Sequence, residues 1–133
     1  MQHNVTCLLR ISYWTGAVVD FIAGWMMLVP GLFAFMNRPR LFQPDAEYQY
    51  AMGMVVPLMF GWTILLLWAD RKPLERKGIL PITLLVVFGE ILTQAWGISV
   101  GFIPLTAVVP TFILQGALVS LFCFAYFHAG RAQ

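Results

Sequence analysis

Four polar side chains lie in stretches of this sequence that are otherwise almost entirely apolar. Glu90 and Gln94 fall in VVFGEILTQAW (residues 86–96), and Asp20 and Gln115 each interrupt another apolar run. A carboxylate at the centre of a bilayer costs about 2.5–3.5 kcal/mol on insertion scales, and an ionisable residue at that depth is by default a candidate functional site. We therefore take Asp20, Glu90, Gln94 and Gln115 as candidate residues for binding a ligand or a proton.

The two carboxyl groups have no cationic partner within the apolar runs, because these runs contain no Lys, Arg or His. If Asp20 and Glu90 face each other at low dielectric, they resist double ionisation. Three kinds of site fit: a carboxyl pair that shares a proton, a proton relay, or a site for a cation or for a cationic or hydroxyl-bearing ligand. The alternative is that the polar residues only hold helices together, through hydrogen bonds worth about 0.6 kcal/mol on average.

The elements that must position these residues follow from the composition. The 133-residue chain is 60% hydrophobic and 11% charged, whereas soluble domains are about 45–50% apolar and about 25% charged. Four runs are long enough for the approximately 20 apolar residues of a membrane-spanning helix: about 11–36, 48–68, 79–102 and 105–127. We predict one domain over 1–133, an all-α integral membrane four-helix bundle with up-down topology.

The distribution of basic residues predicts the orientation. Six of the eight Lys and Arg residues fall on one side of this topology, at the two termini and in the loop after residue 68. The other two, Arg38 and Arg40, fall on the opposite side. Lys and Arg accumulate in cytoplasmic loops, so both termini are predicted to be cytoplasmic.

With this topology the polar residues share one depth. Asp20, Glu90 and Gln115 lie nine, eleven and ten residues into their predicted spans, which is about 15 Å at 1.5 Å per residue and hence the middle of the hydrocarbon core. Glu90 and Gln94 are four residues apart and share a helix face. Three helices are therefore expected to bring polar side chains to one midplane site.

Small residues accompany the polar ones. Gly16 and Gly24 lie on the same face as Asp20, and a row at intervals of four (Gly89, Thr93, Gly97, Gly101) runs beside Glu90. Such small-xxx-small rows allow close approach of helices, so we expect them inside the bundle or between protomers.

Other kinds of site find little support. The net charge of +2 and the lack of a basic stripe argue against nucleic-acid binding. The apolar runs contain no His for a haem or zinc site, and Cys7 and Cys123 form no C-x-x-C pair. No nucleotide-binding or hydrolase motif occurs. We predict no metal, no cofactor and no catalytic residue.

The segment GWTILLLWADRKPLERKGILPIT (residues 61–83), together with four spans and both ends inside, resembles the small bacterial DoxX-like integral membrane proteins. The resemblance implies a multi-pass protein of the bacterial inner membrane. That group is loosely associated with redox and membrane-complex roles, and the resemblance assigns no functional residue.

The leading interpretation is non-enzymatic: a membrane protein whose midplane polar site binds or passes a small ligand, cation or proton. Membrane lipid surrounds it, and we expect a homo-oligomer or a partner in a membrane complex. Two alternatives stay open. The chain could be a structural or accessory subunit of a larger membrane complex, or a lipid-modifying enzyme that uses Glu90 or Asp20 as acid or base.

Overall fold

A computed structural model describes residues 2–40 and 42–131, and within them the chain is all-helical. Five helices follow one another: α1 (Gln2–Leu28), α2 (Pro30–Asn37), α3 (Ala46–Asp70), α4 (Ile79–Ser99) and α5 (Leu105–Arg131). Four of them contain segments long and apolar enough to cross a membrane: Asn4–Leu28, Ala46–Asp70, Ile79–Ser99 and Leu105–Gly130. The prediction of an all-α chain with four candidate spans is confirmed.

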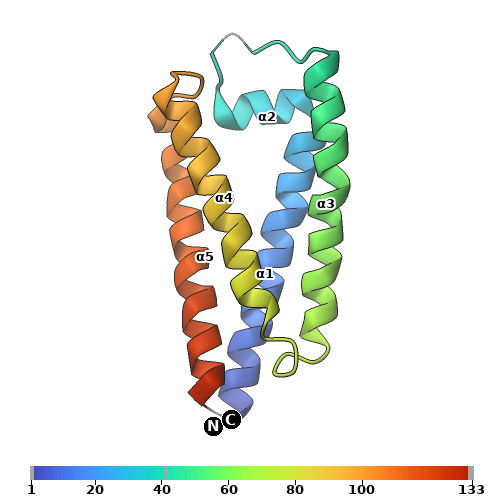
Figure 1. Cartoon of the computed structure of the whole chain (residues 1–133), viewed down its shortest axis with the longest axis vertical. Coiled ribbons are helices and arrows are strands. Elements are labelled where there is room, and N and C mark those ends of the chain that lie inside the picture. The colour runs from blue at the N-terminus through green and yellow to red at the C-terminus, as the bar shows by residue number, and fades with distance from the viewer. Residues whose placement is uncertain (1, 41, 132–133) are drawn as a thin grey trace.

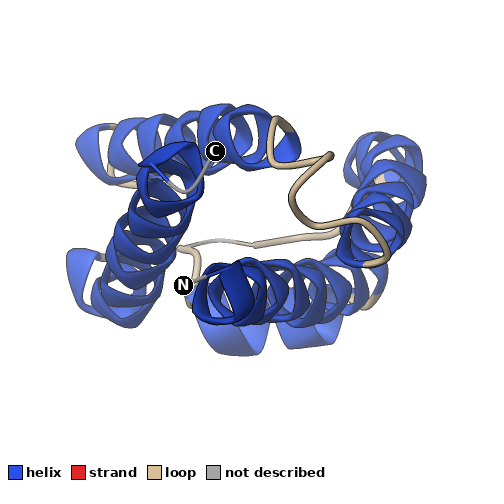
Figure 2. Cartoon of the chain, turned by 90° about the horizontal axis from the view of Figure 1, so that it is seen from below, coloured by secondary structure: helices blue, strands red, loops and turns tan. Residues whose placement is uncertain are grey.

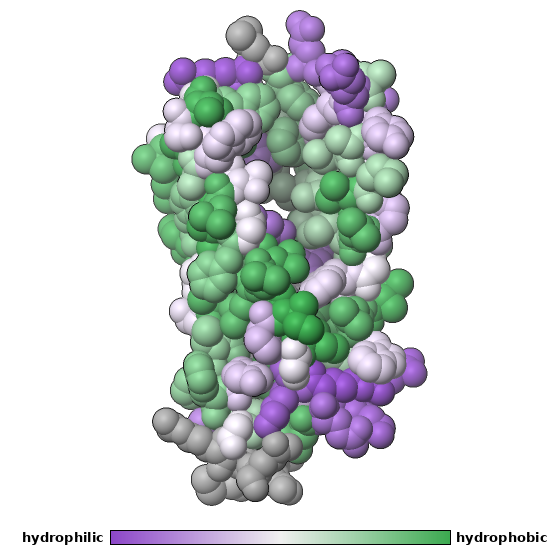
Figure 3. Space-filling model, in the orientation of Figure 1, coloured by the Kyte–Doolittle hydropathy of each residue, from purple (hydrophilic) through white to green (hydrophobic). Residues whose placement is uncertain are grey.

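The four long helices run alternately in opposite directions, so that both termini lie at one end of the molecule (Figure 1). We call this the terminal end, and we call the opposite end, where α2 lies, the α2 end. The view along the bundle shows the helices arranged around a common centre (Figure 2). On the face shown in Figure 3, apolar residues cover the middle and hydrophilic residues gather towards both ends, as expected for a protein that faces hydrocarbon along its length.

The outer part of the first predicted span differs from expectation. The sequence predicted one span over 11–36, but α1 ends at Leu28 and a separate eight-residue helix, α2, follows. Val29 between them has an extended backbone (φ −111°, ψ 101°), and Pro30 occupies the first turn of α2. Proline disfavours the helical conformation of the residue before it. The break therefore turns α2 across the end of the bundle, which a hydropathy profile alone does not reveal (Figure 1).

The tightly packed core lies towards the terminal end, where α1 fits between α3 and α5. Tyr13, Leu66 and Phe122 are fully buried there. A Cβ added at Gly16 would lie 3.0 Å from Leu66 Cδ1 and 3.1 Å from Phe122 Cζ. Glycine at this position therefore sets how closely α1 approaches both neighbours.

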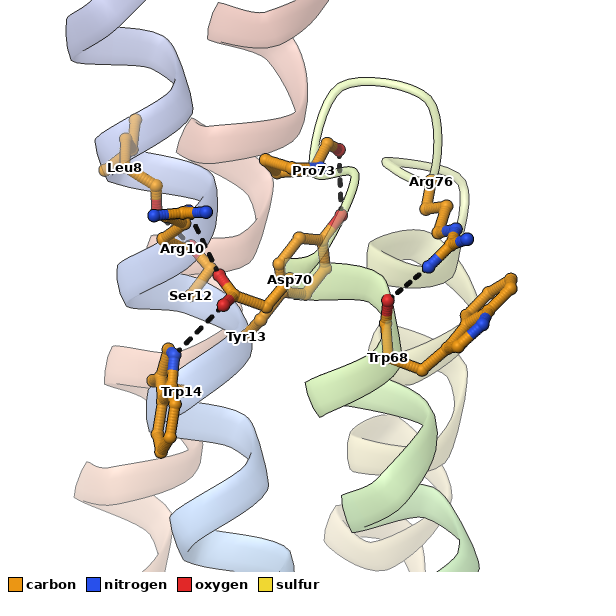
Figure 4. Close-up of polar contacts among 9 residues, drawn as sticks. All are labelled: Leu8, Arg10, Ser12, Tyr13, Trp14, Trp68, Asp70, Pro73 and Arg76. Atoms are coloured by element: carbon orange, nitrogen blue, oxygen red, sulfur yellow. Dashed lines mark hydrogen bonds and ion pairs between the residues drawn. The ribbon is translucent and has the colours of Figure 1, made fainter.

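Polar contacts at the terminal end fix α1 against the end of α3 (Figure 4). Trp14 Nε1 donates to Asp70 Oδ2 at 3.3 Å, and Arg10 Nε lies 3.5 Å from Asp70 Oδ1. The hydroxyl of the buried Tyr13 donates to the carbonyl oxygen of Pro73 at 3.2 Å. Arg10 and Asp70 thus lie at one level, and Asp20 is ten residues further along α1, about 15 Å away.

Arg76 helps to hold the turn between α3 and α4. The guanidinium carbon of Arg76 lies 3.3 Å from the ring centroid of Trp68, and Arg76 also donates to the carbonyl oxygen of Trp68. Higher up, Trp62 Nε1 donates to Thr83 Oγ1 at 3.2 Å and joins α3 to α4. These contacts join the first turns of α4 and the turn before it to α3.

The α2 end is closed by contacts between segments far apart in sequence. The rings of Phe33, Phe42 and Tyr48 pack against one another with centroids 5.0–5.6 Å apart. The backbone N–H of Arg40 donates to the carbonyl oxygen of Phe102 at 3.0 Å, which joins the segment after α2 to the turn between α4 and α5. α2 therefore covers this end of the bundle.

Candidate functional site

The centre of the candidate site is a hydrogen bond between α4 and α5. Gln115 Nε2 donates to Glu90 Oε2 at 3.4 Å. The Gln115 side chain is almost fully buried, with 3% of its surface exposed. It occupies the same inward face of α5 as Leu118 and Phe122, which are also buried. Burial of this face in the core positions the amide towards α4.

Asp20 contributes a third polar group from α1. Its Oδ2 atom is buried. The side chains of Asp20 and Glu90 are only partly covered by other residues of the chain. The structure joins Glu90 and Gln115 directly, and the buried Oδ2 of Asp20 is the polar group that α1 contributes. Their role in binding remains a prediction.

Gln94 lies one turn beyond Glu90 on α4, on the side of the α2 end. Its Oε1 atom is buried and accepts no hydrogen bond from the described residues. The same holds for Asp20 Oδ2 and Gln115 Oε1. A buried acceptor without a donor costs about 1–3 kcal/mol, so three of them in one region are an unusual concentration of unmet hydrogen-bonding capacity.

All three of these atoms are acceptors, and this sets the chemistry of the site. An ionised carboxylate only accepts hydrogen bonds, and the oxygen of a glutamine amide only accepts. Among the described residues, the hydrogen bond to Glu90 comes from the Gln115 amide. With no Lys, Arg or His in the helix segments around it, the site has no positive charge of its own, and its side-chain N–H donors are the amide groups of Gln94 and Gln115.

The sequence suggested that the row of small residues beside Glu90 brings helices close together. Within the chain it does not. Gly89 and Thr93 are exposed, and a Cβ added at Gly89 would meet nothing within 4 Å. Gly97 faces only the side chain of Ile103, and Gly101 lies beyond the end of α4 with φ +72°. The prediction that this row lets two helices of the bundle pack closely is therefore wrong.

The small residues of α1 are the ones that bring helices together. Besides Gly16, Gly24 lies under the ring of Phe60, where an added Cβ would be 3.0 Å from Cε1. Both lie near Asp20 on α1, as the sequence predicted. Close packing of α1 on α3 thus holds Asp20 in position from both sides along the helix.

A cavity lies between α1, α2 and α3 on the α2 side of the site. It is partly open, its volume is about 220 Å³, and both apolar and polar groups line it: Met27, Leu28, Pro30, Tyr48, Gln49, Met52, Gly53 and Val56. In the same half of the molecule the surface is hollowed between α3 and the α4–α5 pair, with hydrophilic residues visible inside (Figure 3). The hydroxyl of Tyr48 is buried without a partner among the described residues.

The sequence analysis did not find this cavity, although two spacings point to it. Met27 lies seven residues after Asp20, which places both on one face of α1, and Met52 and Val56 are four residues apart on α3. What the sequence did not show is the turn at Val29, which brings Pro30 over the top of these residues.

Metal binding finds no support in the geometry. No group of three or more His, Cys, Asp or Glu side chains that could hold a metal ion occurs within 2–40 and 42–131. Asp20 and Glu90 alone offer fewer protein ligands than structural or catalytic zinc sites use.

No protein-family model, no curated protein and no solved structure matches this chain. No family match therefore supports the resemblance to DoxX-like proteins. The function must be inferred from the geometry of the chain itself.

Proposed function

We propose that this chain is a multi-pass protein of the bacterial inner membrane whose midplane site binds a small cation that donates hydrogen bonds. Asp20, Glu90, Gln94 and Gln115 form the site. The observation that supports the proposal most strongly is the presence of three buried acceptors without donors beside Glu90. Each of the three helices α1, α4 and α5 contributes one of these acceptors.

The charge and the hydrogen-bonding groups of the site favour the same kind of ligand. Two carboxyl groups at low dielectric are costly unless a positive charge accompanies them. An ammonium group supplies one positive charge and up to three N–H donors, and it has no acceptor that would need a partner. An anion would add repulsion, and a single shared proton would satisfy only one of the three free acceptors.

The proposed orientation in the membrane can be tested separately. Both termini lie at one end of the bundle, and we place that end in the cytoplasm because six of the eight Lys and Arg residues belong to it. Alkaline phosphatase, which is active only after export, should be inactive when fused after Gln133. It should be active when inserted within residues 38–45. The reverse pattern of activities would contradict the orientation.

Binding can be tested with a small cation as the ligand. Ethylammonium should raise the unfolding temperature of the protein in mild detergent by several degrees at concentrations well above its Kd, because a ligand that binds only the folded state stabilises it by mass action. Tetramethylammonium is the matched control, since it has the same charge and no N–H donor, and it should have a much smaller effect.

Equal shifts with the two cations would show that only charge or ionic strength acts, and would overturn the proposed donor site. The absence of any shift with ethylammonium would overturn it as well.

A further inference from the structure

We infer that the turn between α3 and α4 binds the headgroup of an anionic phospholipid, and that the guanidinium group of Arg76 contacts the headgroup phosphate. This site goes beyond the proposed function and shares no residue with the layer of Asp20 and Glu90. The inference rests on the place of the turn, on its charge, and on the geometry of Arg76 over Trp68.

The turn lies at the level where lipid headgroups are expected. One candidate span ends at Asp70 and the next begins at Ile79, so residues 71–78 lie directly beyond the apolar part of two consecutive helices. Trp68 is in the last turn of α3, and 46% of its surface is exposed. Tryptophan is enriched at the membrane–water interface, because its ring is apolar and its N–H is polar. A phospholipid that packs its acyl chains against α3 and α4 would therefore place its phosphate at this turn.

The charge of the turn favours an anion. Residues 71–78 contain four basic side chains and one acidic one, which is a net charge of +3. The acidic one, Glu75, is paired with Lys72, with Oε2 and Nζ 2.9 Å apart. Neither Arg71 nor Arg76 forms an ion pair within the part of the chain that the structure describes. Basic side chains just beyond a span attract anionic headgroups, so these two arginines are available to a lipid phosphate.

The geometry of Arg76 prepares its guanidinium group for a phosphate. The guanidinium carbon lies 3.3 Å from the centroid of the Trp68 ring, and Nη1 donates to the carbonyl oxygen of Trp68 (Figure 4). A guanidinium group has five N–H donors in a planar fork, which matches two phosphate oxygens. The described residues accept a hydrogen bond from only one of its nitrogens. The ring and the carbonyl oxygen thus hold the fork in place while most of its donors stay available.

Native mass spectrometry in mild detergent tests the inference, with dioleoyl phosphatidylglycerol as the anionic lipid and dioleoyl phosphatidylcholine as the zwitterionic control. The wild-type protein should bind phosphatidylglycerol several-fold more tightly. Arg76→Gln should weaken phosphatidylglycerol binding by about fivefold and leave phosphatidylcholine binding unchanged. Arg40→Gln is the matched control and should bind both lipids as the wild type does. Arg40 is exposed at the α2 end, in a segment (residues 38–47) with equal numbers of basic and acidic side chains.

Equal affinities for the two lipids would overturn the headgroup site, and so would equal losses in Arg76→Gln and Arg40→Gln. Millimolar inorganic phosphate should not displace phosphatidylglycerol, because it has no acyl chains to contact the apolar helices. Displacement would show that the turn takes free anions, and the lipid would be wrong. Should Arg76→Gln not fold, Arg76→Lys keeps the charge without the planar fork. It should still weaken phosphatidylglycerol binding more than Arg40→Lys does, and equal effects would contradict the inference.

Discussion

Replacing Glu90 by glutamine should remove guest binding while leaving the helical bundle intact. Glutamine has nearly the same shape, and its side-chain oxygen can still accept the hydrogen bond from Gln115 Nε2 that Glu90 accepts in the wild type. What the variant loses is the negative charge. Removing one partner of a buried, hydrogen-bonded charge pair costs about 2–5 kcal/mol, so ethylammonium affinity should fall by about 30-fold or more. The dependence of the unfolding temperature on ethylammonium concentration measures this loss.

Glu47→Gln is the matched control for this substitution. Glu47 lies in the first turn of α3 and is exposed, so the same chemical change there should leave ethylammonium binding as in the wild type. The unfolding temperature of Glu90→Gln without ethylammonium should not fall, because one of two carboxyl groups that repel each other has been removed. A variant that binds the guest normally, but unfolds earlier or loses an oligomeric state, would show that the polar layer only holds helices together.

Gly16→Val should lower the stability of the helical bundle. The added side chain would meet Leu66 and Phe122 at about van der Waals contact or closer, since Cβ alone lies 3.0 Å and 3.1 Å from their atoms. Both neighbours are fully buried. Overpacking of this kind costs about 1–3 kcal/mol, and it should also displace α1, and hence Asp20, from its neighbours. Thermal or denaturant unfolding in detergent measures the loss.

Gly116→Val separates overpacking from the general effect of replacing glycine by a β-branched residue in a helix. Gly116 is exposed on α5, and a Cβ there would meet nothing within 4 Å. Its substitution should change stability by less than Gly16→Val does. If the two variants lose the same stability, close packing of α1 against α3 and α5 does not limit the fold.

The architecture was largely predictable because a membrane-spanning helix needs a long apolar run, and this requirement is visible in the sequence. The ranges predicted for the last three spans overlap α3, α4 and α5. The first span was not delimited well. Its apolar character continues past Leu28 into α2, and only Pro30 signals the break. Hydropathy records how apolar a segment is, but it does not record whether the backbone turns.

The members of the candidate site could also be predicted, because depth and helix periodicity both follow from residue number. Depth placed Asp20, Glu90 and Gln115 in one layer, and the structure brings Gln115 into hydrogen-bonding contact with Glu90. Depth and periodicity do not predict which face of a helix packs against a neighbour. Gly89 and Thr93 look outwards, because α4 packs mainly on α5 and turns a different side inwards. A row of small residues does not determine which helix packs against it.

The cavity between α1, α2 and α3 depends on tertiary structure alone. It exists because α2 folds back over Met27 and Met52, and these methionines are not distinguishable in the sequence from ordinary packing residues. The contacts of Asp70 with Arg10 and Trp14 were equally hidden, since they join residues about sixty positions apart.

The central claim is that the carboxyl and amide groups at the bundle's midplane bind a hydrogen-bond-donating cation. Saturation-transfer NMR of ethylammonium with the wild-type protein and with Glu90→Gln, in the same detergent, tests it most directly. We predict transfer from the wild-type protein to the ethyl protons of the guest, and its loss in Glu90→Gln but not in Glu47→Gln. No transfer from the wild-type protein, or equal transfer from all three proteins, would contradict the claim.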